Sequence, residues 1–171
     1  MQEKGTLSVN TENLMPIIKK WLYSDKDIFL RELVSNACDA ISKLDKLASM
    51  GEASMPESCR VEIRANKSEN TLTVSDNGLG MTADEVRKYI NQVAFSGAYD
   101  FLEKYENQAD GKDIIGHFGL GFYSAFMVAE KVVIQTKSYQ PGAEAVRWES
   151  DGSSEYELSS GSRTQPGTDI I

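Results

Sequence analysis

Two spacings of apolar residues divide the chain into predicted helices and strands. Helical spacing predicts a helix capped by Thr11, a second helix from Ser24 to about Gly51, and further helices over 86–95, 99–105 and 122–128. Alternating and β-rich runs predict strands at 60–65, 71–75, 131–137, 145–149 and 155–158, with another beginning at Thr168. Turns rather than linkers separate these elements, so the pattern predicts one α+β domain.

The second predicted helix carries an unusual polar face. At roughly 100° per residue, Glu32, Asn36 and Asp39 share one arc, whereas the apolar residues between positions 30 and 44 form a separate stripe that must face a core. A polar arc is most often a solvated surface, and that interpretation stays open for this helix alone. Ser35, Asn36 and Asp39 are weaker helix formers than Glu or Lys, however, which indicates a role beyond solubility.

A glycine-containing turn follows the strand at 71–75. Asp76, Asn77 and Gly78 alone would suit a simple turn, because these residues tolerate left-handed backbone conformations. Gly80 and Met81 extend it beyond what a hairpin needs. Thr82, with Glu85 three residues later, forms a capping box and predicts that a helix begins there.

A second glycine-rich segment carries Gly116, Gly119 and Gly121 immediately before a predicted helix. Its spacing is neither the dinucleotide fingerprint nor a P-loop, since no Gly-Lys-Ser/Thr follows. Exposed backbone N–H groups at the start of a helix favour phosphate, so the segment is a candidate anion site. A glycine-rich hinge is the alternative.

In this order, the three segments resemble the sequence boxes shared by gyrase-type ATPases, sensor histidine kinases, mismatch-repair ATPases and ninety-kilodalton heat-shock chaperones, together called the GHKL superfamily. Three runs resemble the chaperones most, and among them the bacterial HtpG type: LYSDKDIFLRELVSNACDA, SDNGLGMT and IGHFGLGFYSAFMVAEKV. The resemblance covers about 11–168. It implies a two-layer α/β sandwich of the GHKL (Bergerat) type, in which helices cover one face of a mixed sheet and ATP lies between the layers.

The implied function is that of an ATP-binding domain in a stress-response chaperone, which hydrolyses ATP weakly and assists the folding of unfolded client proteins. The alternatives are a nucleotide-binding module without turnover of its own and a gyrase- or MutL-type ATPase, against which the run FGLGFYSAF argues. We expect 1–171 to be a single N-terminal ATP-binding domain, truncated before the end of the sheet. In the family, the strand at Thr168 completes a central part of that sheet. Client binding and homodimerisation are expected to need downstream domains.

The resemblance also implies roles for individual residues, with ATP or ADP and Mg²⁺ as the bound groups. Glu32 is expected to orient and activate the attacking water, Asn36 to bind Mg²⁺, and Asp76 to accept a hydrogen bond from the adenine amino group. Asp39 is expected to support these residues without touching the nucleotide. Further nucleotide contacts are expected from Gly80, Met81, Gly116, Gly119, Gly121, Phe122 and Thr168.

A segment at about 95–118 corresponds to the lid that closes over ATP in the family. Two residues depart from the usual pattern there. Phe95 replaces a lysine that can approach the nucleotide phosphates in relatives, and His117 replaces a common glutamine. ATP binding is still expected, whereas nucleotide affinity and lid position stay open.

Charge and composition narrow the function classes. The formal net charge of −8 argues against nucleic acid as a major partner, because phosphate binding needs a basic surface. The chain has neither an 18-residue apolar run nor a signal-peptide apolar region, so we expect no membrane partner and a cytoplasmic location. Cys38 and Cys59 are expected to be small buried thiols in a reducing compartment. The lone His117 cannot form a metal cluster.

Overall fold

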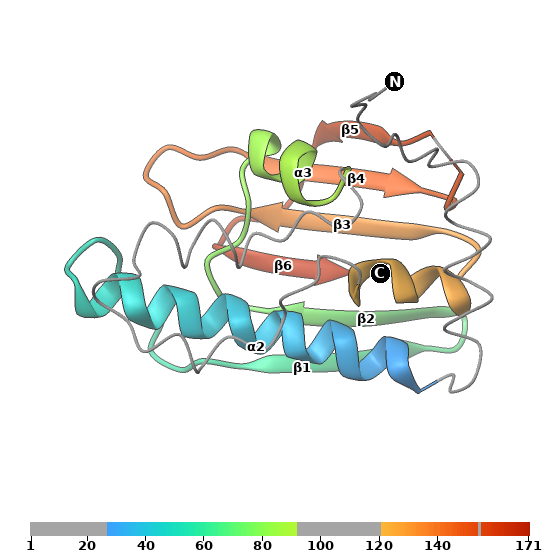
Figure 1. Ribbon diagram of the computed structural model, residues 1–171, viewed down its shortest axis with the longest axis horizontal. Coiled ribbons are helices and arrows are strands. Elements are labelled where there is room, and N and C mark those ends of the chain that lie inside the picture. The colour runs from blue at the N-terminus through green and yellow to red at the C-terminus, as the bar shows by residue number, and fades with distance from the viewer. Residues whose placement is uncertain (1–26, 92–120, 154) are drawn as a thin grey trace, which may run out of the picture.

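A computed structural model describes residues 27–91, 121–153 and 155–171 of the chain. Figure 1 shows one sheet with the helices lying on a single face of it, so the predicted α+β class and its two-layer arrangement are confirmed. The elements follow in this order: α2 (Ile28–Ser49), β1 (Val61–Asn66), β2 (Thr71–Asp76), α3 (Ala83–Tyr89), the 3₁₀-helix η3 (Gly121–Met127), β3 (Val132–Lys137), β4 (Ala145–Ser150), β5 (Glu157–Ser160) and β6 (Gly167–Ile170).

The sheet has the strand order β1-β2-β6-β3-β4-β5, so the last strand of the chain lies between β2 and β3. The central position expected for the strand at Thr168 is confirmed. The expected mixed sheet is wrong for the described strands, because every neighbouring pair is antiparallel. β2 and β3 do run in the same direction, but β6 separates them and is antiparallel to both.

The main core lies between the sheet and the helices. One row of side chains crosses the sheet in register and faces the helices: Val74, Ile170, Ile134, Trp148 and Leu158. Phe122 packs edge-to-face on Trp148 with ring centroids 5.6 Å apart, which joins η3 to β4. The stripe of small and aliphatic residues on α2, which includes Leu33 and Ala37, is buried as its spacing predicted.

Two helices differ in detail from their predictions. The helix expected at 122–128 is a 3₁₀-helix at Gly121–Met127, in which the Ser124 hydroxyl donates to the Gly121 carbonyl at 2.5 Å. Such a local side-chain bond competes with regular α-helical bonding. α3 begins at Ala83 behind the Thr82–Glu85 capping box, which is confirmed, but it ends at Tyr89 and not at the predicted residue 95. The helices predicted near Thr11 and at 99–105 lie outside the described residues.

Both cysteines are exposed, so the prediction of buried thiols is wrong. Cys38 follows buried Ala37 on α2, but one residue turns a helix by about 100° and carries its side chain off the buried stripe. Cys59 lies in the exposed segment before β1. No helix within the described ranges is long and apolar enough to cross a membrane.

A candidate nucleotide site at the end of strand β2

Asp76 is the last residue of β2 and a deeply buried carboxylate, with 7% of its surface exposed. The Gly78 N–H donates to its Oδ1 at 2.8 Å, which fixes the carboxylate across the turn. Burial raises the pKa of Asp76 from 3.8 to about 6, against the opposing effects of the Gly78 and Thr168 N–H groups and of the Arg163 cation. At neutral pH this group is therefore a buried anionic acceptor.

Thr168 lies directly opposite Asp76 on β6 and opposite Thr136 on β3. The Thr136 hydroxyl donates to the Gly167 carbonyl at 3.1 Å and accepts the Met81 N–H at 2.9 Å. Either hydroxyl could be the donor in the 3.0 Å contact between Thr136 and Thr168; when the Thr136 proton goes to the Gly167 carbonyl, Thr168 is the donor. Only acceptor capacity then remains on the Thr168 oxygen. Thr136 was missed from the sequence, where it is one polar residue in an alternating strand.

The glycine turn after β2 is held between α2 and β3. A side chain at Gly78 would lie 2.6 Å from the Ala40 backbone, and the Leu79 N–H donates to the Ala40 carbonyl at 3.2 Å. Gly80 has a φ of +61°, and a Cβ there would overlap the Lys137 carbonyl. The structure shows a packing role for Gly80 against β3, and its expected contact with the nucleotide stays a prediction.

Glu32 marks the other end of the candidate site. Its half-buried side chain lies against the first residue of η3, since a Cβ at Gly121 would lie 2.5 Å from Glu32 Oε2. Ala40, which contacts the glycine turn, follows Glu32 by eight residues, or about 12 Å along the helix axis. One rigid helix therefore sets the separation between the Asp76 turn and the start of η3.

Asn36 and Asp39 lie between these two ends of α2. Asn36 is exposed, one helical turn after Glu32, while Asp39 is buried. Burial lowers the pKa of Lys43, and the nearby Asp39 carboxylate opposes that shift. In the part of the chain that the structure describes, no three His, Cys, Asp or Glu side chains gather into a metal cluster. An exposed amide oxygen fits Mg²⁺, which takes phosphate and water oxygens and needs few protein ligands.

The remaining expected contacts lie partly within and partly outside the described residues. The Phe122 ring is buried in the aromatic core, so only its backbone could meet a ligand. Met81 is partly buried against the same core. The other expected contacts and the lid at 95–118 lie outside the described residues, namely Gly116, Gly119, Phe95 and His117.

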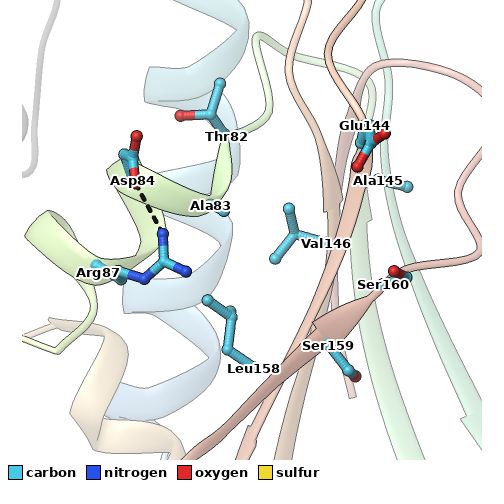
Figure 2. Close-up of a pocket in the computed structure, with 10 residues that line it drawn as sticks. All are labelled: Thr82, Ala83, Asp84, Arg87, Glu144, Ala145, Val146, Leu158, Ser159 and Ser160. Atoms are coloured by element: carbon cyan, nitrogen blue, oxygen red, sulfur yellow. Dashed lines mark hydrogen bonds and ion pairs between the residues drawn. The ribbon is translucent and has the colours of Figure 1, made fainter.

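A separate hollow of about 380 Å³ lies between α3 and the strands β4 and β5. Figure 2 shows Thr82, Asp84 and Arg87 on one side of it, with Val146 and Leu158 across from them. Arg87 and Asp84 pair with each other at 2.7 Å. No residue expected to bind nucleotide lines this hollow, so it is distinct from the candidate site.

Comparison with known proteins gives matches over nearly the whole chain. The family model described as "Histidine kinase-, DNA gyrase B-, and HSP90-like ATPase" matches residues 24–164. A chaperone protein HtpG from Bacteroides fragilis is 57% identical over 169 residues, which cover 99% of this chain and 24% of that protein.

More distant relatives match over the same region. A chaperone protein HtpG from Porphyromonas gingivalis is 54% identical, over 100% of this chain and 25% of that protein. The mitochondrial heat shock protein 75 kDa of Bos taurus is 41% identical, over 98% of this chain and 24% of that protein. The chain therefore spans about a quarter of the length of these relatives.

Proposed function

The chain belongs to the family of histidine kinase-, DNA gyrase B- and HSP90-like ATPases, and we propose that it is the ATP-binding and ATP-hydrolysing domain of a molecular chaperone. One observation carries this proposal. A buried anionic acceptor at the end of β2 and a carboxylate against the start of η3 are held by the same helix, α2. The relatives named as chaperones favour this interpretation over a gyrase- or MutL-type ATPase.

Base recognition would take place at the strand end. Asp76 would accept a hydrogen bond from the adenine amino group. Thr168, with its proton directed to Thr136, would accept one from a bridging water. Guanine carries a carbonyl where adenine carries its amino group. That oxygen would face the Asp76 carboxylate with no proton between them, so the site should reject GTP.

The phosphates would lie toward the start of η3. Backbone N–H groups of Gly121 and Phe122 would bind phosphate oxygens, together with those of Gly116 and Gly119. Met81 and Gly80 would border the base. The Asn36 amide oxygen would hold Mg²⁺, whose chemical contribution there would be to neutralise phosphate charge.

Glu32 would act on the water that attacks the γ-phosphate. The water oxygen forms the new bond to phosphorus, the bond to the bridging oxygen of ADP breaks, and Glu32 accepts the proton that the water loses. The products are ADP and inorganic phosphate. Asp39 would hold its part of α2 in place from its buried position.

A second part of the proposal concerns activities that need more than this chain. We propose that assistance to unfolded client proteins and homodimerisation depend on regions downstream, because the relatives are about four times as long as the matched segment. We also propose a cytoplasmic location, which the similarity to bacterial chaperone proteins HtpG supports. For this chain alone, the second candidate is a nucleotide-binding module without useful turnover.

Calorimetric titration of this chain with Mg-ADP, Mg-ATP and Mg-GTP tests the proposal. We expect both adenine nucleotides to bind and GTP not to, with Asp76→Ala as the variant that loses binding. Steady-state ATP turnover of this chain, measured beside the full-length protein, separates the ATPase from the binding module. Equal affinity for ATP and GTP, or none for either, would overturn the adenine site.

A further inference from the structure

Arg163 makes the densest set of polar contacts near the candidate site. Its Nε donates to the Gln165 carbonyl at 3.2 Å, and its Nη2 donates to the carbonyls of Pro166 at 3.2 Å and Asp76 at 2.8 Å. Its Nη1 donates to Asp169 Oδ1 at 2.5 Å. Four of the five guanidinium N–H donors are thereby used, on a side chain that is 15% exposed.

The partner carboxylate of Asp169 is tied to β2 as well. The Ser75 hydroxyl donates to the same Asp169 oxygen at 2.5 Å. Ser75 and Asp169 form the cross-strand pair next to Asp76 and Thr168. Because side chains alternate along a strand, this cluster lies on the far face of the sheet, directly behind the two residues proposed to read the base.

Gly167 makes this arrangement possible. Its φ of +124° suits glycine, and a Cβ there would lie 2.5 Å from Arg163 Nη2 and would also overlap the Asp76 carbonyl. The backbone at the start of β6 therefore passes close to both the guanidinium and the Asp76 carbonyl, where a side chain would not fit. Lys137 holds the same turn from β3, since its Nζ donates to the Thr164 carbonyl at 3.1 Å.

We propose that Arg163 is a positioning residue for base recognition, which fixes the end of β2 to the start of β6 from behind so that Asp76 and Thr168 meet the same adenine. The inference rests on the proposed function. A lysine could not replace this side chain, because its three donors leave from one point and cannot reach all four acceptors around the guanidinium.

The cation also acts on the carboxylate it positions. Arg163 lowers the pKa of Asp76 against the larger effect of burial, and Asp169 raises it slightly. Other charged groups lie on elements packed against this strand end: Glu32, Asp39 and Lys43 on α2, and Lys137 on β3. Removal of the guanidinium should therefore shift the pH range in which Asp76 is an anion, as well as its position.

The test compares Arg163→Gln and Arg163→Lys by adenosine affinity between pH 5 and pH 8. Adenosine has no phosphate, so no phosphate group titrates in this range. We expect Arg163→Gln to weaken adenosine and ADP by the same factor, about ten-fold, and to move the midpoint of the pH profile upward. Arg163→Lys should weaken binding similarly but keep the midpoint near that of the wild type, because the charge remains.

The matched control is Arg147→Gln, on the same face of the sheet and also paired with a carboxylate, that of Glu149. It should leave adenosine affinity and the midpoint unchanged. If Arg163→Gln does not fold, Asp169→Asn keeps the backbone contacts of Arg163 and should still weaken adenosine binding. A folded Arg163→Gln protein with the wild-type adenosine affinity and the wild-type midpoint of the pH profile would overturn this inference but not the proposed function. A wild-type protein that binds no adenosine or adenine nucleotide would overturn the proposed function and the inference with it.

Discussion

The Glu32 carboxylate lies so close to the backbone of Gly121 that a methyl group at position 121 would be 2.5 Å from Glu32 Oε2. The contact joins two segments that are 89 positions apart in the sequence. Gly121 also accepts the Ser124 hydroxyl, so the first turn of η3 is held on its other side. The Glu32 carboxylate is the far end of a flexible side chain, so it is the partner that would move.

Gly121→Ala should therefore displace the Glu32 side chain. We expect a loss of at most about 1 kcal/mol in the free energy of unfolding, because the end of the Glu32 side chain can move aside, and a larger loss of ATP turnover than of ATP affinity. Urea unfolding and turnover of the full-length protein measure the two effects. In a Glu32→Ala background the same glycine change should cost little stability. An unchanged cost in that background would show that Glu32 does not limit the space.

Glu32→Gln separates binding from chemistry. The amide has nearly the same shape as the carboxylate but is a poor proton acceptor, so hydrolysis in the full-length protein should fall by roughly 10²–10⁴-fold. Mg-ATP affinity should stay within about two-fold of the wild type, because Glu32 is proposed to meet the water and not the nucleotide. Parallel losses of affinity and turnover would instead assign Glu32 to nucleotide binding.

Most of the described helices and strands could be predicted from the sequence, whereas the roles of Glu32 and Asp76 in the site stay predictions. Alternation in the strands, the Thr82–Glu85 capping box and the order of the three boxes all depend on neighbouring residues. The roles of Thr136 and Arg163 could not be predicted this way. Each role depends on the register of β6. That register brings Thr136 to Gly167, 31 residues away in the chain, and Arg163 to Asp76, 87 residues away.

The glycine turn shows the same limit in one residue. A turn at Gly80 was predictable from composition, but its reason was not, because the Lys137 carbonyl that excludes a side chain belongs to a strand 57 positions later. The exposure of Cys38 has a different, local origin. A one-residue rotation about α2 decides whether a small apolar side chain meets the core, and composition carries no such information.

Gly80→Ala and Gly142→Ala form a matched pair that tests this packing role. Both glycines have positive φ, +61° and +78°, but Gly142 has open space around its Cβ position while Gly80 faces the Lys137 backbone. Gly142→Ala should cost about 1 kcal/mol from backbone strain alone. Gly80→Ala should cost about 3 kcal/mol or more in chemical denaturation, since a backbone carbonyl must move as well. Equal costs would show that the turn relaxes freely away from β3.

Asp76→Asn should move stability and ligand affinity in opposite directions. The pKa of Asp76 is about 6 in the folded protein, against 3.8 for an unperturbed aspartate such as that of the unfolded chain. Between these values the folded state holds the proton more tightly, so this group makes the free energy of unfolding fall as pH rises from about 4 to about 6. Above about pH 6 the full cost of the buried carboxylate is present, at most about 3 kcal/mol.

The amide removes that cost while its oxygen can still accept the Gly78 N–H. Asp76→Asn should therefore exceed the wild type in unfolding free energy by about 1–3 kcal/mol at pH 8, and the difference should vanish near pH 4. ADP affinity should fall by about a hundred-fold, because the amide cannot replace the anionic acceptor for the adenine amino group. Urea unfolding at pH 4, 6 and 8 and calorimetry with ADP measure both effects.

Asp84→Asn, at an exposed carboxylate paired with Arg87, is the control and should leave ADP affinity unchanged and show no gain in stability at pH 8. A less stable Asp76→Asn protein at pH 8, or one with wild-type ADP affinity, would contradict the account of a buried anion kept for base recognition.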